Sequence, residues 1–540
     1  MGEIELYDAT LRDGMGGGGL DLTVREKLQV VHRLDALGID IVEAGFPASN
    51  PKESELFALL ATEQLDHAEV AAFGMTRRRD ASADADPGLA EIAGCFAPIC
   101  TIVGKSSPLH VEVVVRVSPE ENLAMIAESV AFLVGEGKRV ILDAEHFFDG
   151  YAEDPSFALE CVRAAAEAGA ERVVLCDTNG GSLPMQVQAV LGTVRESLPD
   201  LALGIHTHDD SGCAVANSLV AVHAGATQVQ GTMNGIGERT GNANLVTLIA
   251  DLQLKMGFQL LDPERLASLT QTAHFMDEVL NRTPGAAQPY VGKNAFAHKA
   301  GLHAAGVRTD ARTFEHVDPA LVGNDRDLLV SELSGRATIM EKAQEAGVEL
   351  DELSAQRTAQ RVKELEHRGY QFEAADGSFE LLMRRQSGHY ERLFELESWR
   401  VIVEKRAQGG VATEATIKLW VPDRKTGMRI VRTAEGNGPV NALDKALREA
   451  IGEIHPHLRD IELVNFKVRI LDEEKGTGAV TRVLLDSSDG DLSWGAIGVS
   501  ENVIEASWEA LVDAIEYGMQ PGRQHSERPP ALKGSSEPAT

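Results

Sequence analysis

Short β-rich runs recur through the first half of the chain at intervals of about 30 residues, the length of one strand–helix unit. The eight runs are "IELYDAT" (4–10), "DIVEAGFP" (40–47), "VAAFGMT" (70–76), "CTIVG" (100–104), "RVILDAEHF" (139–147), "RVVLCDTN" (172–179), "ALGIHTHD" (202–209) and "QVQGTMNG" (228–235). Amphipathic stretches with helical spacing separate them, for example "VREKLQVVHRLDALG" (24–38). Eight strands that alternate with helices over about 250 residues are typical of a (β/α)8 barrel. An open doubly wound sheet is the alternative, but it rarely needs eight strands.

The unusual polar side chains of these runs gather toward their C-terminal ends. They are Arg12 and Asp13, Glu43, Arg77, Glu145, Asp177, Thr178 and Asn179, His206 and His208, and Asn234. Active sites of barrels are built at the C-terminal ends of the strands. The distribution therefore supports the barrel and predicts a catalytic face at that end.

The charge of the chain limits its partners. A formal net charge of −32 argues against binding to nucleic acid or to an anionic membrane, because both depend on basic patches. A local cluster such as Arg77–Arg79 can still hold a small anionic substrate. No apolar run has the length of a membrane span, and the start "MGEIELYDAT" (1–10) is not patterned as a signal peptide. The five cysteines form no C-x-x-C pair, so we expect reduced thiols in a cytoplasmic protein.

A candidate metal site follows from the seventh run. His206 and His208 lie two residues apart on a strand, so their imidazoles project to the same side. An isolated H-x-H pair is more often two partly buried polar histidines. In a closed barrel, however, strand eight neighbours strand one, so Asp13 meets the histidines, and Asn242 follows strand eight. Such a set of oxygen and nitrogen ligands suits Mg²⁺ or Mn²⁺, with Zn²⁺ as an alternative.

Five motifs carry a resemblance to a known family. They are "YDATLRDG" (7–14), "DAEHFFDGY" (143–151), "LCDTNGG" (175–181), "HTHDDSGCAVANS" (206–218) and "NGIGERTGNANL" (234–245). On these motifs the chain resembles the isopropylmalate/homocitrate/citramalate synthase family of metal-dependent barrels over nearly its whole length. Later stretches such as "AFAHKAGLHAAGV" (295–307) and "GVSENVIEASWEALVDAIEYG" (498–518) are most similar to the citramalate synthase branch.

The resemblance implies a Claisen condensation, in which the acetyl group of acetyl-CoA is added to a 2-oxo acid and the thioester is then hydrolysed. Arg12 would point a fixed cation at the keto oxygen, where negative charge develops. Glu145 is placed to steer the enol or its base, and Thr178 to bind the substrate carboxylate. Glu43 either lines the substrate pocket or holds Arg12 in place. His303 is implied as the general base, which would reach the barrel of a neighbouring subunit, with His298 in a supporting role.

The glycine tract "RDGMGGGG" (12–19) satisfies G-x-G-x-x-G, which suggests a dinucleotide loop. Asp13 at the end of the strand would repel a pyrophosphate, so this reading is not favoured. The tract most resembles a flexible loop that lets the backbone approach metal and substrate.

Three positions depart from the family pattern: Ala9 in "DAT", Gly16 where a glutamine is usual, and Phe314 where a tyrosine is common. These departures leave open the alternative that the chain is a degenerate relative, which binds a ligand but does not catalyse the reaction. The 2-oxo acid also stays open: pyruvate is preferred, and 2-oxoisovalerate, the substrate of a 2-isopropylmalate synthase, is the alternative. Other barrel relatives run the reverse reaction as CoA-ester lyases.

The part of the chain from about residue 396 onward contains no metal or nucleophile constellation. From about residue 396, two rounds of β-rich runs each end in a helix, which predicts a repeated α+β domain. It resembles the effector domain of the family, so we expect an amino-acid effector, with isoleucine favoured, and a homodimer. The expected domains are a catalytic barrel (1–265), helical linker subdomains (266–395), an effector-binding α+β domain (396–520) and a disordered tail (521–540).

Overall fold

A computed structural model describes residues 4–520 except 48, 300, 329–334, 389, 406, 408, 426, 472–475 and 477. The chain forms two compact units, one of Met1–Phe296 with Glu315–Arg326 and one of Ala297–Phe314 with Asp327–Thr540. The expected boundaries at residues 265 and 395 stay a prediction, and the expected disordered tail lies outside the described residues.

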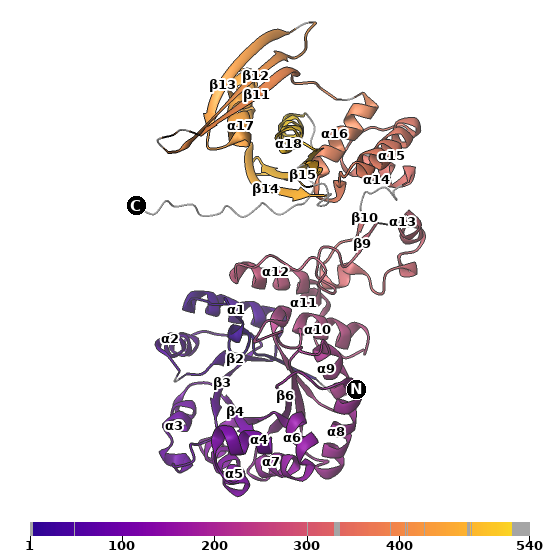
Figure 1. Cartoon of the computed structure of the whole chain (residues 1–540). Coiled ribbons are helices and arrows are strands. Elements are labelled where there is room, and N and C mark those ends of the chain that lie inside the picture. The colour runs from indigo at the N-terminus through magenta and orange to yellow at the C-terminus, as the bar shows by residue number, and fades with distance from the viewer. Residues whose placement is uncertain are drawn as a thin grey trace. The chain divides into compact units, whose positions relative to one another are not determined.

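Eight parallel strands close into a barrel in the first unit, in sequence order from β1 to β8. Figure 1 shows the ring of strands surrounded by helices. The predicted (β/α)8 barrel is therefore confirmed. The strands are β1 (Glu5–Asp8), β2 (Ile41–Gly45), β3 (Glu69–Met75), β4 (Ile99–Lys105), β5 (Arg139–Glu145), β6 (Arg172–Asp177), β7 (Leu203–Thr207) and β8 (Gln228–Gly231).

The helices of the first unit are amphipathic and bury their apolar faces against the outside of the barrel. The first of them, α1, begins with a capping box between Thr23 and Glu26 and ends at Gly38, whose φ of 99° favours glycine. The helices are α1 (Val24–Leu37), α2 (Pro51–Leu60), α3 (Pro87–Gly94), α4 (Pro108–His110), α5 (Pro119–Gly135), α6 (Phe147–Glu153), α7 (Pro155–Glu167), α8 (Pro184–Ser197), α9 (Ala214–His223), α10 (Leu245–Leu254), α11 (Pro263–Ala267) and α12 (Leu269–Val279).

The main core of the first unit lies between the strands and the helices, while the barrel interior holds only a small apolar cluster. That cluster consists of Tyr7, Ala9, Ile41, Ala71, Ile99, Ile141, Val174 and Cys176. The rest of the interior is free for polar side chains from the strands.

The second unit contains a helical part and two antiparallel three-stranded sheets. Its first part has β9 (Ala297–His298) paired with β10 (Asp327–Leu328), then α13 (Gly301–Thr309), α14 (Arg336–Glu345), α15 (Glu352–His367) and α16 (Asp376–Ser387). One sheet has β11 (Glu395–Lys405), β12 (Val411–Val421) and β13 (Met428–Gly436), followed by α17 (Pro439–Ile451). The other has β14 (Glu462–Ile470), β15 (Thr481–Ser488) and β16 (Ser493–Ser500), followed by α18 (Val503–Met519). The predicted pair of strand-then-helix repeats is confirmed.

Among the described residues, no helix has the length and apolar character needed to cross a membrane. The five cysteines are free thiols.

Candidate functional site

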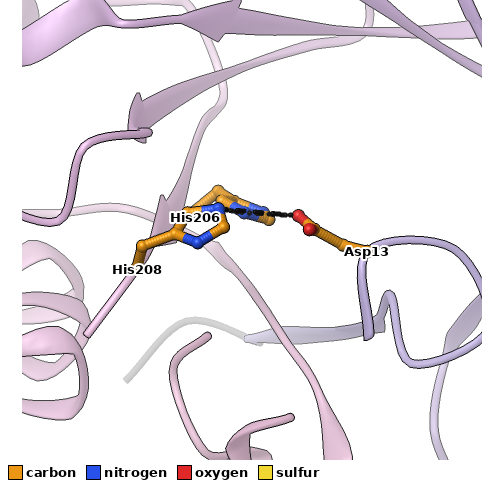
Figure 2. A group of neighbouring side chains, drawn as sticks. All are labelled: Asp13, His206 and His208. Atoms are coloured by element: carbon orange, nitrogen blue, oxygen red, sulfur yellow. Dashed lines mark hydrogen bonds and ion pairs between the residues drawn. The ribbon is translucent and has the colours of Figure 1, made fainter. Parts of the chain in front are cut away.

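Three of the predicted metal ligands meet at the C-terminal end of the barrel. The Nε2 atom of His206 lies 3.2 Å from Oδ2 of Asp13, and Nε2 of His208 lies 3.7 Å from the same oxygen. The two Nε2 atoms are 3.3 Å apart. Figure 2 shows the three side chains pointing toward one another. One ligand atom from each residue lies within 4.8 Å of the others, which is the spacing of a shared metal ion.

The fold brings these residues together through barrel closure and a tight glycine turn. His206 is in β7 and His208 follows it, so both project from one side of the strand. Asp13 lies in the loop after β1 and immediately precedes a short 3-10 helix, Gly14–Gly16. A Cβ on Gly17 would lie 2.9 Å from the carbonyl oxygen of Gly237, so a larger residue would push the two loops apart.

Electrostatics keep Asp13 and His208 in forms that bind a cation, whereas for His206 the burial that would lower its pKa is outweighed by the hydrogen bond to Asp13, so that its pKa is raised. Burial alone would raise the pKa of Asp13, but the Arg12 guanidinium and the hydrogen bond from His206 hold it well below its usual value. Burial, aided by the charge of His206, lowers the pKa of His208 to about 4, so this imidazole is neutral near pH 7. An ionised carboxylate and a neutral imidazole are the forms that bind metals.

Asn242, the fourth predicted ligand, lies beside His208, with which it forms an isolated β-bridge. Its Nδ2 atom donates to the carbonyl oxygen of Ile236 at 3.2 Å. Its Oδ1 atom is buried and has no hydrogen-bond partner among the described residues. An unpaired buried oxygen is costly unless something binds it. This oxygen, with the carboxylate and the two imidazoles, fits a divalent ion of the Mg²⁺ or Mn²⁺ type.

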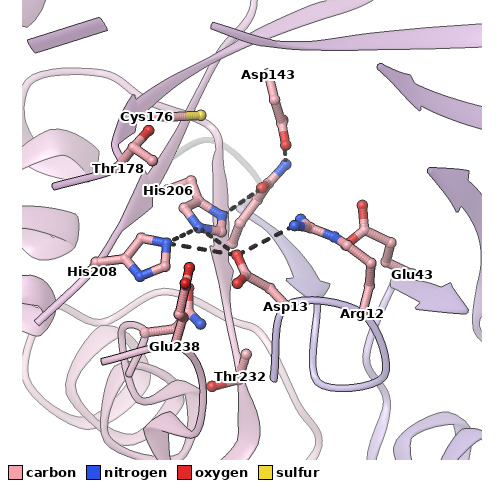
Figure 3. Close-up of polar contacts among 12 residues, drawn as sticks. Arg12, Asp13, Glu43, Asp143, Cys176, Thr178, His206, His208, Thr232 and Glu238 are labelled. Atoms are coloured by element: carbon pink, nitrogen blue, oxygen red, sulfur yellow. Dashed lines mark hydrogen bonds and ion pairs between the residues drawn. The ribbon is translucent and has the colours of Figure 1, made fainter. Parts of the chain in front are cut away.

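The guanidinium of Arg12 lies beside the metal-binding group and contacts three side chains. Its Nε atom donates to Oε2 of Glu43 at 2.6 Å, its guanidinium lies 4.0 Å from the ring centroid of Phe73, and its Nη1 atom lies 3.4 Å from Oδ2 of Asp13. Oε1 of Glu43 accepts a hydrogen bond from the hydroxyl of Tyr7 at 2.8 Å. Glu43 is completely buried. The structure therefore favours the second of its two expected roles, as the group that holds Arg12 (Figure 3).

Glu145 and Thr178 lie at the ends of the neighbouring strands β5 and β6. Glu145 forms an ion pair with Lys105 at the end of β4. The Oγ1 atom of Thr178 accepts a hydrogen bond from the backbone N–H of His146 at 2.8 Å, which leaves its hydroxyl hydrogen free to donate. The roles expected for Glu145 and Thr178 stay predictions.

His303 belongs to the second compact unit, whereas the metal-binding group belongs to the first. It lies in α13, and its ring stacks on that of Phe314 with 4.2 Å between centroids. Phe314, a departure from the family pattern, thus contacts the residue implied as the general base. Its role as the base stays a prediction.

Several residues of the site were not predicted. Tyr7, Phe73, Lys105, Asp143 and Gln230 all point into the site or contact a residue that does. The signal that could have found Asp143 and Gln230 is a polar residue inside a strand that the barrel is expected to bury, "RVILDAE" and "QVQG". Such residues are conspicuous because burial of an unpaired polar group is costly.

Family models match the chain in three consecutive segments. The HMGL-like model matches residues 3–274, the homocitrate synthase post-HMGL domain-like model residues 290–370, and the LeuA allosteric (dimerisation) domain model residues 373–519. Together they span both compact units.

Curated relatives align over nearly the full length. An (R)-citramalate synthase from Streptomyces coelicolor is 51% identical over 519 residues, covering 95% of this chain and 96% of the relative. An (R)-citramalate synthase from Aquifex aeolicus is 46% identical over 518 residues, covering 95% and 97%. A probable 2-isopropylmalate synthase from Methanopyrus kandleri is 32% identical over 515 residues, also covering 95% and 97%.

The site predicts that Mn²⁺ binding depends on Asp13. We expect Asp13→Asn to raise the dissociation constant for Mn²⁺ by more than about 100-fold, because even the residues around metal ligands contribute 10–100-fold. Titration calorimetry on the EDTA-treated full chain measures this. Asp149→Asn is the control, since Asp149 pairs with His146 and Asn179 instead. Equal affinity of Asp13→Asn and wild type would rule out the assigned ligand.

Proposed function

Because the chain belongs to the HMGL-like family, together with the (R)-citramalate synthases, we propose that it condenses acetyl-CoA with pyruvate and water to give citramalate and CoA. It is an acyltransferase, and the acetyl group becomes an alkyl group during transfer. The observation that supports this reaction class is the set of metal ligands placed directly beside a fixed arginine. The preference for pyruvate is supported by the identity of 51% to an (R)-citramalate synthase against 32% to a probable 2-isopropylmalate synthase.

Asp13, His206, His208 and Asn242 would hold a divalent ion, which would supply Lewis-acid polarisation of the keto group of the 2-oxo acid. Arg12 adds a cation that does not need to reorganise when negative charge develops on the keto oxygen. The free hydroxyl hydrogen of Thr178 is available to donate to the substrate carboxylate.

The bond-forming step needs a base for the acetyl methyl group, and we assign this role to His303 of a neighbouring subunit. An imidazole removes a proton efficiently near neutral pH. The resulting enolate carbon attacks the keto carbon of pyruvate, and the keto oxygen becomes a hydroxyl after protonation. Water then cleaves the thioester and releases CoA. Glu145, held by Lys105, is proposed to orient the enol or the attacking water.

The second unit is proposed to regulate this reaction. The match to a LeuA allosteric (dimerisation) domain implies a dimer and an effector site. Control by an effector is expected of an enzyme that works in the biosynthetic direction. This expectation also favours a synthase over a CoA-ester lyase, which catalyses the reverse reaction. Isoleucine is the proposed effector, because it is the amino acid expected from a pathway that begins with citramalate. His303 shares a compact unit with the effector domain, so a change in that unit acts directly on the base.

The function predicts a substrate pattern in a CoA-release assay. With acetyl-CoA and a panel of 2-oxo acids, we expect turnover with pyruvate well above that with 2-oxoisovalerate, because a small pocket excludes the branched side chain. EDTA should abolish turnover, and Mg²⁺ or Mn²⁺ should restore it. Higher kcat/KM with 2-oxoisovalerate would favour the alternative, a 2-isopropylmalate synthase. Full turnover after exhaustive chelation would contradict the role of a metal, and no turnover with any 2-oxo acid would favour a ligand-sensing relative.

A second prediction concerns Arg12. We expect Arg12→Lys to lower kcat by about 10²–10³ while KM for pyruvate changes much less, because one aligned donor to a developing oxyanion has that effect. A lysine cannot pair with Glu43 and face Asp13 at once, as the planar guanidinium does. Arg139→Lys is the matched control, since Arg139 pairs with Glu171 near the N-terminal end of β5. An unchanged kcat in Arg12→Lys would mean that Arg12 is structural.

A third prediction concerns the effector. We expect isoleucine to inhibit the full-length enzyme and leucine to have little effect. Couplings of this kind change affinity roughly 5–150-fold. The dissociation constant for Mn²⁺ should not change with isoleucine, because the proposed ligands all lie in the other compact unit. Inhibition by leucine alone would contradict the effector and shift the substrate toward 2-oxoisovalerate.

A further inference from the structure

A chain of hydrogen bonds runs through the barrel interior to one of the proposed metal ligands. Nε2 of Gln228 donates to Oε2 of Glu5 at 2.6 Å. Nε2 of Gln230 lies 3.3 Å from Oε1 of Gln228 and donates to Oδ1 of Asp143 at 3.1 Å. Oε1 of Gln230 lies 2.9 Å from Nδ1 of His206. Figure 3 shows the last links of this chain, from Asp143 to His206.

The direction of every bond in this chain follows from its first member. A carboxylate only accepts hydrogen bonds, so Gln228 must turn its NH₂ group toward Glu5 and its oxygen toward Gln230. Gln230 must then present its own NH₂ group to Gln228 and Asp143, which leaves its oxygen for His206. An amide oxygen cannot donate. The bond between Gln230 and His206 therefore requires a proton on Nδ1 of the imidazole.

Burial and strand register restrict how these amides can turn. Gln228 and Gln230 are completely buried, and Asp143 and His206 nearly so. The backbone register fixes them as well, because Gln230 pairs with His206 of β7 on one side and with Tyr7 of β1 on the other. Rotating either amide would bring two donors or two acceptors together, which a buried site tolerates poorly.

We propose that Gln230 is a positioning residue that keeps a proton on Nδ1 of His206, so that Nε2, which lies 3.2 Å from Oδ2 of Asp13, is the nitrogen left to bind the metal. Glu5 and Asp143 in turn fix the orientation of Gln230. His208 is different, because its Nδ1 atom is buried and has no hydrogen-bond partner among the described residues. Hydrogen bonds in the barrel interior thus orient the imidazole of His206, whereas no described residue holds Nδ1 of His208. This inference rests on the metal site in the proposed function.

Mn²⁺ affinity of the full-length chain tests the proposal independently of turnover. We expect Gln230→Met, which has similar length but no acceptor, to raise the dissociation constant for Mn²⁺ by 10–100-fold, the usual effect of removing a partner of a metal-bound histidine. Gln230→Glu keeps an acceptor oxygen for Nδ1 and can share a proton with the Asp143 carboxyl group, so it should lose clearly less Mn²⁺ affinity than Gln230→Met. Asn217→Ala is the control, since Asn217 is a buried amide that donates to the carbonyl oxygen of Ser182 and, within the described part of the chain, forms no hydrogen bond with His206.

Each outcome of the calorimetric titration decides between the alternatives. Equal affinity of Gln230→Met and wild type overturns the proposal. A Gln230→Glu variant that binds as weakly as Gln230→Met also overturns it, because the shape of the amide rather than its acceptor would then matter. If Gln230→Met shows no cooperative thermal unfolding, Gln228→Met takes its place, and weaker Mn²⁺ binding supports the proposal whereas unchanged binding overturns it. A wild-type chain that binds no Mn²⁺ contradicts the metal site of the proposed function instead.

Discussion

The parallel pairing of β1 with β8 closes the barrel, and the catalytic face depends on it. Glu5 pairs with Gln228 and Tyr7 with Gln230, across 223 residues of sequence. Without this contact, Asp13 would have no reason to lie near the histidines of β7 and its following loop. Closure also removes the two free edges that an open sheet of eight strands would expose. The same ladder that completes the fold therefore assembles a carboxylate and two imidazoles into one group.

Barrel closure buries polar side chains at this face, and burial is unfavourable for their charged forms. Burial raises the pKa of Asp143 to about 7 and that of Asp8 to about 7. Glu43 has no exposed surface and shares its two oxygens between Arg12 and Tyr7. Barrel interiors are usually filled by branched apolar residues, but here the apolar cluster in the interior is small. The extensive core between strands and helices supplies the stability that lets the interior carry polar groups.

The features that the sequence predicted are those that follow from the spacing of apolar residues along strands and helices and from the geometry of a closed barrel. Alternating strand and helix patterns located the eight strands, and the period of two residues placed His206 and His208 on one side of β7. The meeting of Asp13 with them followed from closure alone. Gln230 and Asp143 could not be assigned in this way, because a strand buried on both faces has no alternation that shows which residues point inward. Their partners depend on the register between β5, β7 and β8, which only the folded chain defines.

The division into two units explains how regulation can leave the metal group intact. The proposed ligands all belong to the first unit, while His303 belongs to the second together with both antiparallel sheets. A general base contributes about 10²–10⁴-fold to a reaction, and only when it lies within hydrogen-bond reach of the proton. Under the proposed roles, an effector that shifts His303 would lower this contribution without any movement of the metal ligands. Allosteric coupling of 1–3 kcal/mol corresponds to about 5–150-fold, which reaches the lower part of the contribution of a general base.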